Sequence, residues 1–276
     1  GERPGPDITA AAFGVAGVVE GNRCELLNID LVVDGASVGE RFSIDKVALI
    51  NDLEATGYSL PLLAKTDIEL LQAGIKKPGN AAVIAAGTGL GESILFFDGE
   101  RHIPSHSEGG HTDFAPQGAE QIDLLDFLSA RYGHVSYERV LSGEGLGNIY
   151  DFFEAAKAQS PKRVTKSLCG IERSRVIVSE ALSSTNETSK KALDLFISIY
   201  GAEAGNLALK AMATAGVYIG GGIAAGLAGK LKSGIFMDCF INKGRYEKFL
   251  KTIPVYAILN EEAPFIGAAV YAARLI

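Results

Sequence analysis

The chain has 276 residues, of which 47% are hydrophobic and 21% charged, a balance typical of a folded globular protein with a sizeable core. Its net charge is −7 and it contains no basic block, which argues against nucleic acid and anionic membranes as partners. No apolar run approaches the roughly 20 residues of a membrane helix and no signal peptide is visible, so a cytoplasmic location is expected. Cys24, Cys169 and Cys239 lie far apart, which argues against disulfides and structural zinc.

The N-terminal quarter predicts strands followed by a strand-to-helix junction. Residues 8–19 predict a buried strand with its turn, and residues 23–28 a second strand. The run 46–52 predicts a short strand, and "LEATGYSL" continues it as a helix. Asn51 and Asp52 therefore lie at the carboxyl end of a strand, the edge of an open α/β sheet at which ligands bind.

The middle of the chain predicts a meander of strands followed by helices. Residues 80–106 indicate three strands, and the apolar period over 118–133 indicates a helix. A serine cap and a glycine stop predict a short helix over 136–143, and a further helix follows over 145–158. Residues 158–187 are polar and predict loops and short helices.

The last third predicts a long helix and then alternating strands and helices. Residues 189–216 are helical in pattern, with alanine and glycine on one side, so close helix packing is expected. A strand at "VYI", a three-glycine turn and a helix follow, and then a strand over 253–259 and a closing helix. Alternation of strands and helices indicates an α/β protein.

A glycine-rich turn separates the first two strands of the predicted meander. Gly87, Thr88, Gly89 and Gly91 stand between the apolar runs of "NAAVIAAGTGLGESILF". Backbone N–H groups and the threonine hydroxyl on such a turn can bind phosphate oxygens, and missing Cβ atoms let a phosphate come close. The alternative is an ordinary tight hairpin, and neither a Walker loop nor a G-x-G-x-x-G motif is present.

A second glycine cluster, Gly220, Gly221 and Gly222, opens a helix after a strand. Such a turn can hold an adenosine. With Ala225 the cluster also fits a loose dinucleotide-binding pattern, with Asp238 near the distance expected of a ribose-binding acid. An NAD-dependent oxidoreductase is therefore a rival interpretation, weakened because that motif normally begins its domain.

Four further polar residues are candidates for binding or catalysis. Glu108 and His111 stand on "SEGGH" and can exchange hydrogen bonds with a polyol; a solvated surface turn is the alternative, and one histidine with one glutamate is a weak metal site. Glu138 precedes Arg139, which by itself suggests a helical ion pair. Asp52 suits a helix N-cap and equally a general base that takes a proton from an attacking hydroxyl.

In this order along the chain, the motifs "LINDLEA", "AAGTGLG", "SEGGHTDFAP", "YGHVSYERVLSGEGL", "VYIGGGI" and "NKGR" resemble those of the bacterial glucokinase family, from about residue 8 to the end. The resemblance implies a two-domain actin-like ATPase (ribonuclease H-like) α/β fold with an interdomain cleft. It implies a small domain of residues 1–64 with 262–276 and a large domain of residues 65–261. ATP-dependent phosphorylation of glucose at its 6-hydroxyl is the implied activity, with ATP and Mg²⁺ as cofactors. The resemblance also implies a possible homodimer.

The resemblance also implies roles for individual residues. Asp52 matches the catalytic base. The sugar-binding positions are matched by Asn51, Glu108, His111, Glu138 and, in the segment that borders the sugar, Asn28. The phosphate loop is matched by Gly87, Thr88, Gly89 and Gly91, and the adenosine-side turn by Gly220, Gly221 and Gly222. No metal-ligating residue is expected.

Two departures from the family pattern stand out. The family's Asp-x-Gly-Gly-Thr-Asn phosphate motif does not occur in this chain, and the strand that should carry it would precede Gly1, so we expect an incomplete small domain. Asp30 and Leu31 replace a proline and a tryptophan of the family near Asn28. A catalytically impaired sugar-binding homologue or regulator is therefore the alternative function.

Overall fold

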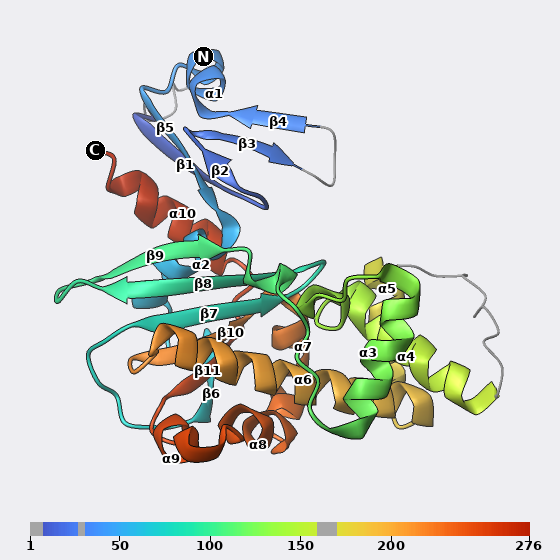
Figure 1. Ribbon diagram of the computed structural model, residues 1–276. Coiled ribbons are helices and arrows are strands. Elements are labelled where there is room, and N and C mark those ends of the chain that lie inside the picture. The colour runs from blue at the N-terminus through green and yellow to red at the C-terminus, as the bar shows by residue number, and fades with distance from the viewer. Residues whose placement is uncertain (1–7, 27–30, 159–169) are drawn as a thin grey trace.

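The computed structural model describes residues 8–26, 31–158 and 170–276. Figure 1 shows two parts: a smaller one that contains the N-terminal strands, and a larger one built on a six-stranded sheet. The last helix of the chain returns to the smaller part (Figure 1).

The large sheet has the strand order β6-β11-β10-β7-β8-β9. Its strands are β6 (Ile68–Gln72), β7 (Ala81–Ala86), β8 (Leu90–Phe97), β9 (His102–Ser107), β10 (Gly216–Gly220) and β11 (Val255–Ile258). Strands β7, β10 and β11 are parallel, while β8 and β9 continue antiparallel from β7. The predicted meander over 80–106 is confirmed.

Strand β7 is buried on both faces, which explains its unbroken apolar sequence. Its even-numbered residues, Ala82, Ile84 and Ala86, join the main core beneath the long helix α6 (Glu187–Ala211). Its odd-numbered residues Ala81 and Val83 pack instead with Leu53 of helix α2 (Asp52–Ser59). The period of two along the strand thus fixes helices on opposite faces of the sheet.

Helix α6 packs closely on α8 (Ile235–Ile241), as its small residues predict. A Cβ on Gly201 would lie 2.1 Å from the Phe236 carbonyl oxygen, and one on Gly205 would lie 2.4 Å from that of Phe240. The rings of Tyr200 and Phe236 meet edge to face at 5.7 Å. The other helices of this part are α3 (Gly118–Tyr132), α4 (Gly143–Ala158), α5 (Gly170–Leu182), α7 (Gly221–Leu231) and α9 (Glu247–Leu250).

The smaller part holds two short sheets. Strands β1 (Ala10–Val15) and β5 (Lys46–Asn51) form a parallel pair, and β2 (Val19–Glu20), β3 (Arg23–Leu26) and β4 (Leu31–Asp34) an antiparallel one. Helix α1 (Gly35–Phe42) follows, capped by Asp34, whose side chain accepts from the Ser37 N–H at 2.8 Å.

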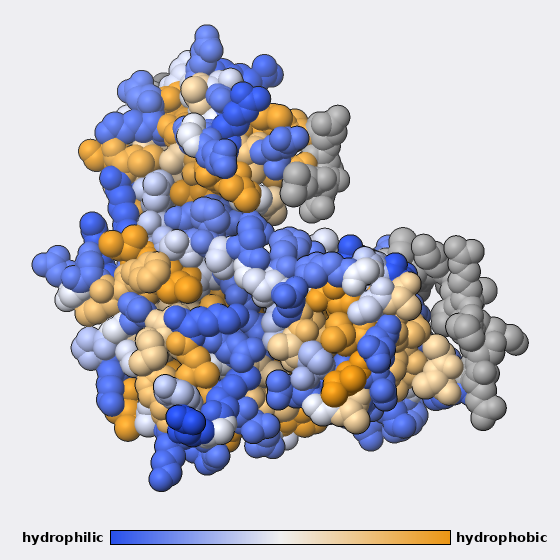
Figure 2. Space-filling view, viewed as in Figure 1, coloured by the Kyte–Doolittle hydropathy of each residue, from blue (hydrophilic) through white to orange (hydrophobic). Residues whose placement is uncertain are grey.

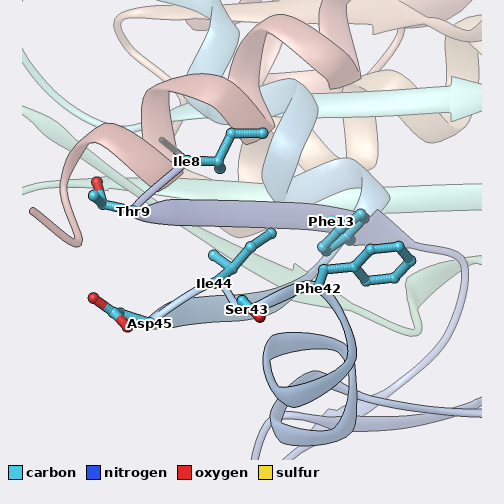
Figure 3. Close-up of a pocket in the computed structure, with 7 residues that line it drawn as sticks. All are labelled: Ile8, Thr9, Phe13, Phe42, Ser43, Ile44 and Asp45. Atoms are coloured by element: carbon cyan, nitrogen blue, oxygen red, sulfur yellow. The ribbon is translucent and has the colours of Figure 1, made fainter. Parts of the chain in front are cut away.

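An open cavity of about 840 Å³ borders this part. Figure 3 shows that its side chains come from the two residues before β1, from the middle of β1, from the end of α1 and from the segment that leads into β5. Ile8, Phe13 and Phe42 are each more than two-fifths exposed. Figure 2 shows several apolar residues on the surface of the smaller part. Among the described residues no strand pairs with the second edge of β1.

Helix α10 (Ala263–Ala273) joins the end of the chain to the smaller part by packing on α2 and β1. A Cβ on Gly267 would lie 1.6 Å from the Ala55 carbonyl oxygen, so only glycine permits this approach. Strand β6, by contrast, pairs with β11 of the large sheet. On this packing we propose the domain division at residues 64/65 and 261/262.

The structure differs from the sequence-based elements at several places. Residues 170–182 form the thirteen-residue helix α5, where loops and short helices were expected, because Ile177 and Ala181 are buried in the main core. The short helix expected over 136–143 is a single 3₁₀ turn, η3 (Tyr137–Arg139). Helices α1 and α8 and strand β6 were not predicted from the sequence. Within the described residues no helix is long and apolar enough to cross a membrane.

Replacing Gly267 by alanine should destabilise the fold by at least about 2 kcal/mol, because the new methyl group collides with backbone rather than with a movable side chain. Gly226, an exposed glycine inside helix α7 with nothing within 4 Å of its Cβ position, is the matched control. Gly226→Ala should stabilise the protein by about 0.5–1 kcal/mol. Urea denaturation measures both; equal effects would contradict the packing argument.

Candidate active site

The junction between β5 and α2 carries the first pair of predicted site residues. Asn51 is the N-cap of α2: its side-chain oxygen accepts from the Leu53 N–H at 2.9 Å, and Glu54 completes a capping box. Its amide nitrogen donates to the Gly17 carbonyl at 3.3 Å. The interpretation of Asp52 as the N-cap is therefore wrong, because its neighbour fills that position. The side-chain oxygen and nitrogen of Asn51 both have hydrogen-bond partners within the protein, so a hydrogen bond to a sugar would be a further bond of the same amide group.

Asp52, the first residue of α2, is half-buried. Burial raises the pKa of its carboxyl above the ordinary range, and the charge of Glu108 adds to this shift, whereas the hydrogen bond from the Leu53 N–H at 2.9 Å opposes it. A carboxylate in this setting binds a proton more strongly than one in water. The contribution of Glu108 indicates that the two carboxyl groups lie near each other.

The turn after β9 brings the polyol-type residues together. His111 Nε2 lies 3.8 Å from Glu108 Oε2, and His111 Nδ1 lies 4.0 Å from Glu138 Oε1. All three side chains keep solvent access, with Glu138 the least exposed of them at 31%. Residues from two separate turns, 107–111 and 137–139, therefore converge on one accessible place. Asn28 lies outside the described residues.

Strand β9 is tied to the helix that carries Asp52. His106, next to the turn, lies with its Nδ1 3.2 Å from Glu54 Oε2. A Cβ on Gly57 of α2 would stand 2.9 Å from Pro104 of β9. These two contacts fix the turn 107–111 relative to the β5–α2 junction.

The glycine turn between β7 and β8 is held by its own hydrogen bonds. The Gly87 N–H donates to the Gly89 carbonyl at 2.9 Å, and the Leu90 N–H donates to Glu138 Oε2 at 3.0 Å. A Cβ on Gly89 would lie 2.4 Å from Glu138 Oε2, and one on Gly91 2.4 Å from the Leu53 side chain. At these two positions glycine makes room for protein neighbours; a Cβ on Gly87 meets nothing within 4 Å, and Thr88 is exposed.

The second glycine cluster lies at the end of β10 and opens α7, as predicted. Gly221 has φ +87°, and a Cβ there would lie 2.4 Å from the Ala86 carbonyl oxygen. Beside the cluster is a pocket of about 270 Å³. Thr56 of α2 lines it from the smaller part, together with Ala263 and Pro264 of α10. The Thr56 hydroxyl donates to the backbone carbonyl of Asp52 at 2.9 Å, so this pocket and the junction share one helical turn.

Asp238 does not occupy the place that a dinucleotide-binding fold requires. It is exposed on helix α8, whereas the ribose-binding acid of such folds follows a strand. The distance in sequence that suggested it is therefore a coincidence. No cluster of three or more metal-ligating side chains occurs among the described residues.

Sequence reasoning passed over two buried acids beneath these turns, Glu92 of β8 and Glu203 of α6, which are 2% and 0% exposed. Burial, and then the charge of Glu203, raise the pKa of Glu92 from its ordinary value of 4.5 to about 7. The one charged residue in the largely apolar strand β8, and a glutamate among the alanines and glycines of α6, were the available signals.

Comparisons with known proteins agree with one another. A family model described as Glucokinase matches residues 3–275. The glucokinase of Synechocystis is 38% identical over 97% of this chain and 80% of its own length. The crystal structure of a glucokinase from an Antarctic psychrotroph aligns with a TM-score of 0.81 at 28% identity, over 95% of this chain and 80% of that one.

A ROK family glucokinase from Streptomyces griseus, solved in complex with glucose and AMPPNP, aligns with a TM-score of 0.61 at 20% identity, over 97% of this chain and 82% of that one. At this identity the likeness concerns the fold alone. The expected two-domain actin-like ATPase fold is confirmed.

Replacing Glu92 by glutamine should remove a pH-dependent part of the stability. Because the pKa of Glu92 is raised on folding, its contribution is fully present below about pH 4.5 and is lost as the pH rises to about 7. The parent should therefore lose up to about 3 kcal/mol more than Glu92→Gln across this window. Urea denaturation of both proteins at several pH values measures the difference; parallel curves would contradict the raised pKa.

Proposed function

The chain belongs to the glucokinase family and is a glucose kinase, and we propose that it transfers the phosphoryl group from ATP to the 6-hydroxyl with Asp52 as general base. The observation that carries this proposal is the position of Asp52: a half-buried carboxylate at a strand's end, electrostatically coupled to Glu108 and one helical turn from the pocket at Gly220–Gly222. A sugar and a nucleotide bound at these two places would share one helix.

The proposed role of Asp52 follows from its proton affinity. A sugar hydroxyl is too weak an acid to ionise at neutral pH, so a base within about 3 Å must take its proton as the oxygen attacks phosphorus. The raised pKa makes Asp52 a better proton acceptor than an exposed aspartate. The Leu53 N–H on its Oδ1 orients the carboxylate.

The proposed sugar contacts are Glu108, His111 and Glu138, with Asn51 and Asn28 as further candidates. Two carboxylates and an imidazole offer acceptors and donors to a ligand covered in hydroxyls. In the bound state a group left unpaired costs about 1–3 kcal/mol, which is a source of sugar selectivity. Their solvent access without sugar fits groups that keep water until a ligand replaces it.

The proposed nucleotide contacts lie on the two glycine turns. Because the N–H groups of Gly87 and Leu90 are already donated within the protein, we assign phosphate contact to the Thr88 hydroxyl and to the backbone around Thr88 and Gly89. Gly91 acts indirectly, by admitting Leu53. The pocket beside Gly220, Gly221 and Gly222 would take the adenosine, and Arg175 also lines this pocket.

Mg²⁺ enters this proposal with the nucleotide. Magnesium in phosphoryl-transfer sites is held mainly by substrate phosphates and water, with one or two protein carboxylates. A bound ion would neutralise charge on the transferred phosphoryl group. The homodimer and the cytoplasmic location stay predictions.

Asp52→Asn should lower kcat for glucose phosphorylation roughly 10²–10⁴-fold, because the amide cannot accept the proton, while glucose affinity changes little. Asp45→Asn is the matched control: Asp45 is exposed just before the opposite end of the same strand β5. A coupled assay for glucose 6-phosphate and calorimetry with glucose measure the two quantities.

Equal rates in Asp52→Asn and the parent would remove Asp52 from the mechanism. If the parent itself binds glucose but releases no heat with an ATP analogue and forms no product, the sugar-binding homologue is the better description. That second outcome is independent of the Asp52 substitution.

A further inference from the structure

The turn that carries Glu108 and His111 rests on a buried acid. Glu92 lies on β8 beneath it, and a Cβ added to Gly109 would stand 2.1 Å from Glu92 Oε2. The Ser107 hydroxyl, at the start of the turn, donates to the backbone carbonyl of Glu92 at 3.3 Å. The carboxyl group of Glu92 therefore forms the floor of this turn.

The turn that carries Glu138 is attached to the second buried acid, Glu203. Glu203 Oε2 accepts from Asn206 Nδ2 at 2.7 Å, and its Oε1 accepts from Lys210 Nζ at 3.0 Å. Tyr137, the residue before Glu138, is hydrogen-bonded to Glu203 and also accepts from Asn206 at 3.1 Å. Glu203 thus fixes the position of η3 through Tyr137.

The two acids meet each other. The carboxyl groups of Glu92 and Glu203 are close enough to share a hydrogen bond, but two carboxylates have no donor between them, and Glu92 Oε1 is buried without a partner. Two negative charges on buried carboxylates in contact repel each other strongly. A proton shared between the two groups removes this repulsion and gives the unpartnered oxygen a hydrogen bond. Because Glu203 already accepts from three donors, the proton belongs on Glu92, which then donates to Glu203.

The other titratable groups around the pair are on α6, on η3 and after α8. Lys210 pairs with Glu203, and Tyr137 and Tyr200 stay neutral because burial raises their pKa values far above the neutral range. Lys243 also faces Glu203, and burial lowers its pKa. Glu92, with a pKa of about 7, titrates near neutral pH.

We propose that Glu92 is a positioning residue for the sugar site: its protonated carboxyl bridges to Glu203 and so holds the turn of Glu108 and His111 against the turn of Glu138. The inference rests on the proposed function, since it assumes that these three residues bind glucose. Loss of the proton places a second negative charge beside Glu203, pushes the two turns apart and weakens the binding of glucose.

Calorimetric titration of the full chain with glucose from about pH 6 to about pH 9 tests this. The parent should lose affinity by roughly tenfold for each pH unit well above the pKa of Glu92. Glu92→Gln keeps an N–H donor toward Glu203 and cannot ionise, so it should match the parent at about pH 6 and hold that affinity to about pH 9. Since His111 is present in both proteins, the difference between the profiles isolates Glu92.

Two further variants separate positioning from general damage to the fold. Glu92→Leu lacks the donor and should bind glucose about tenfold or more weakly than Glu92→Gln at every pH, an effect of the size of a lost hydrogen bond to a charged group. Ser93 lies next to Glu92 on β8, and its buried hydroxyl donates to the Ser105 carbonyl of β9 at 3.0 Å. Ser93→Ala removes this hydroxyl and should keep the parent's pH profile of glucose affinity. Identical profiles for the parent and Glu92→Gln would overturn the inference. A parent that binds no glucose at any pH would contradict the proposed function itself.

Discussion

The position of helix α2 is the constraint on which the rest of the structure depends. Three glycines from different segments let neighbours approach this helix: Gly267 of α10 at the Ala55 carbonyl, Gly91 of β8 at Leu53, and Gly57 of α2 itself at Pro104. Each contact is closer than a Cβ would allow. The helix is thereby fixed between the closing helix and the β8–β9 hairpin, and its first residue, Asp52, is fixed with it.

Because α2 belongs by sequence to the smaller part but packs on the odd-numbered face of β7, it joins the two parts at one place. The contact between His106 and Glu54 then determines how far the turn 107–111 lies from Asp52. A general base and its substrate must meet within hydrogen-bond distance, and errors of about 1 Å are costly. Rigid packing of glycine against backbone meets that demand better than a flexible loop would.

Structural features could be predicted from the sequence where a residue type fits only one environment. The apolar run of β7, the alanine and glycine face of α6 and the glycine turn before α7 appeared as expected, because burial and close approach leave few alternatives. Helix α5 was missed because its buried positions, among them Ile177 and Ala181, are spaced among polar residues that hide the period. The meeting of Glu92 with Glu203 was out of reach, since 111 residues separate them and only the fold reveals that they share a site.

The glycine turn of residues 87–91 makes room for a protein side chain as well as for the proposed phosphate. Its pattern suggested a backbone laid bare for phosphate, yet at Gly89 the space is taken by Glu138, and the Leu90 N–H is bound to the same carboxylate. The other oxygen of Glu138 faces His111 at 4.0 Å. One side chain therefore ends at the proposed sugar set on one side and at the proposed phosphate turn on the other. Gly89 is needed because a Cβ at this position would collide with the Glu138 carboxylate. The proposed phosphate turn and the proposed sugar site are therefore in direct contact through Glu138.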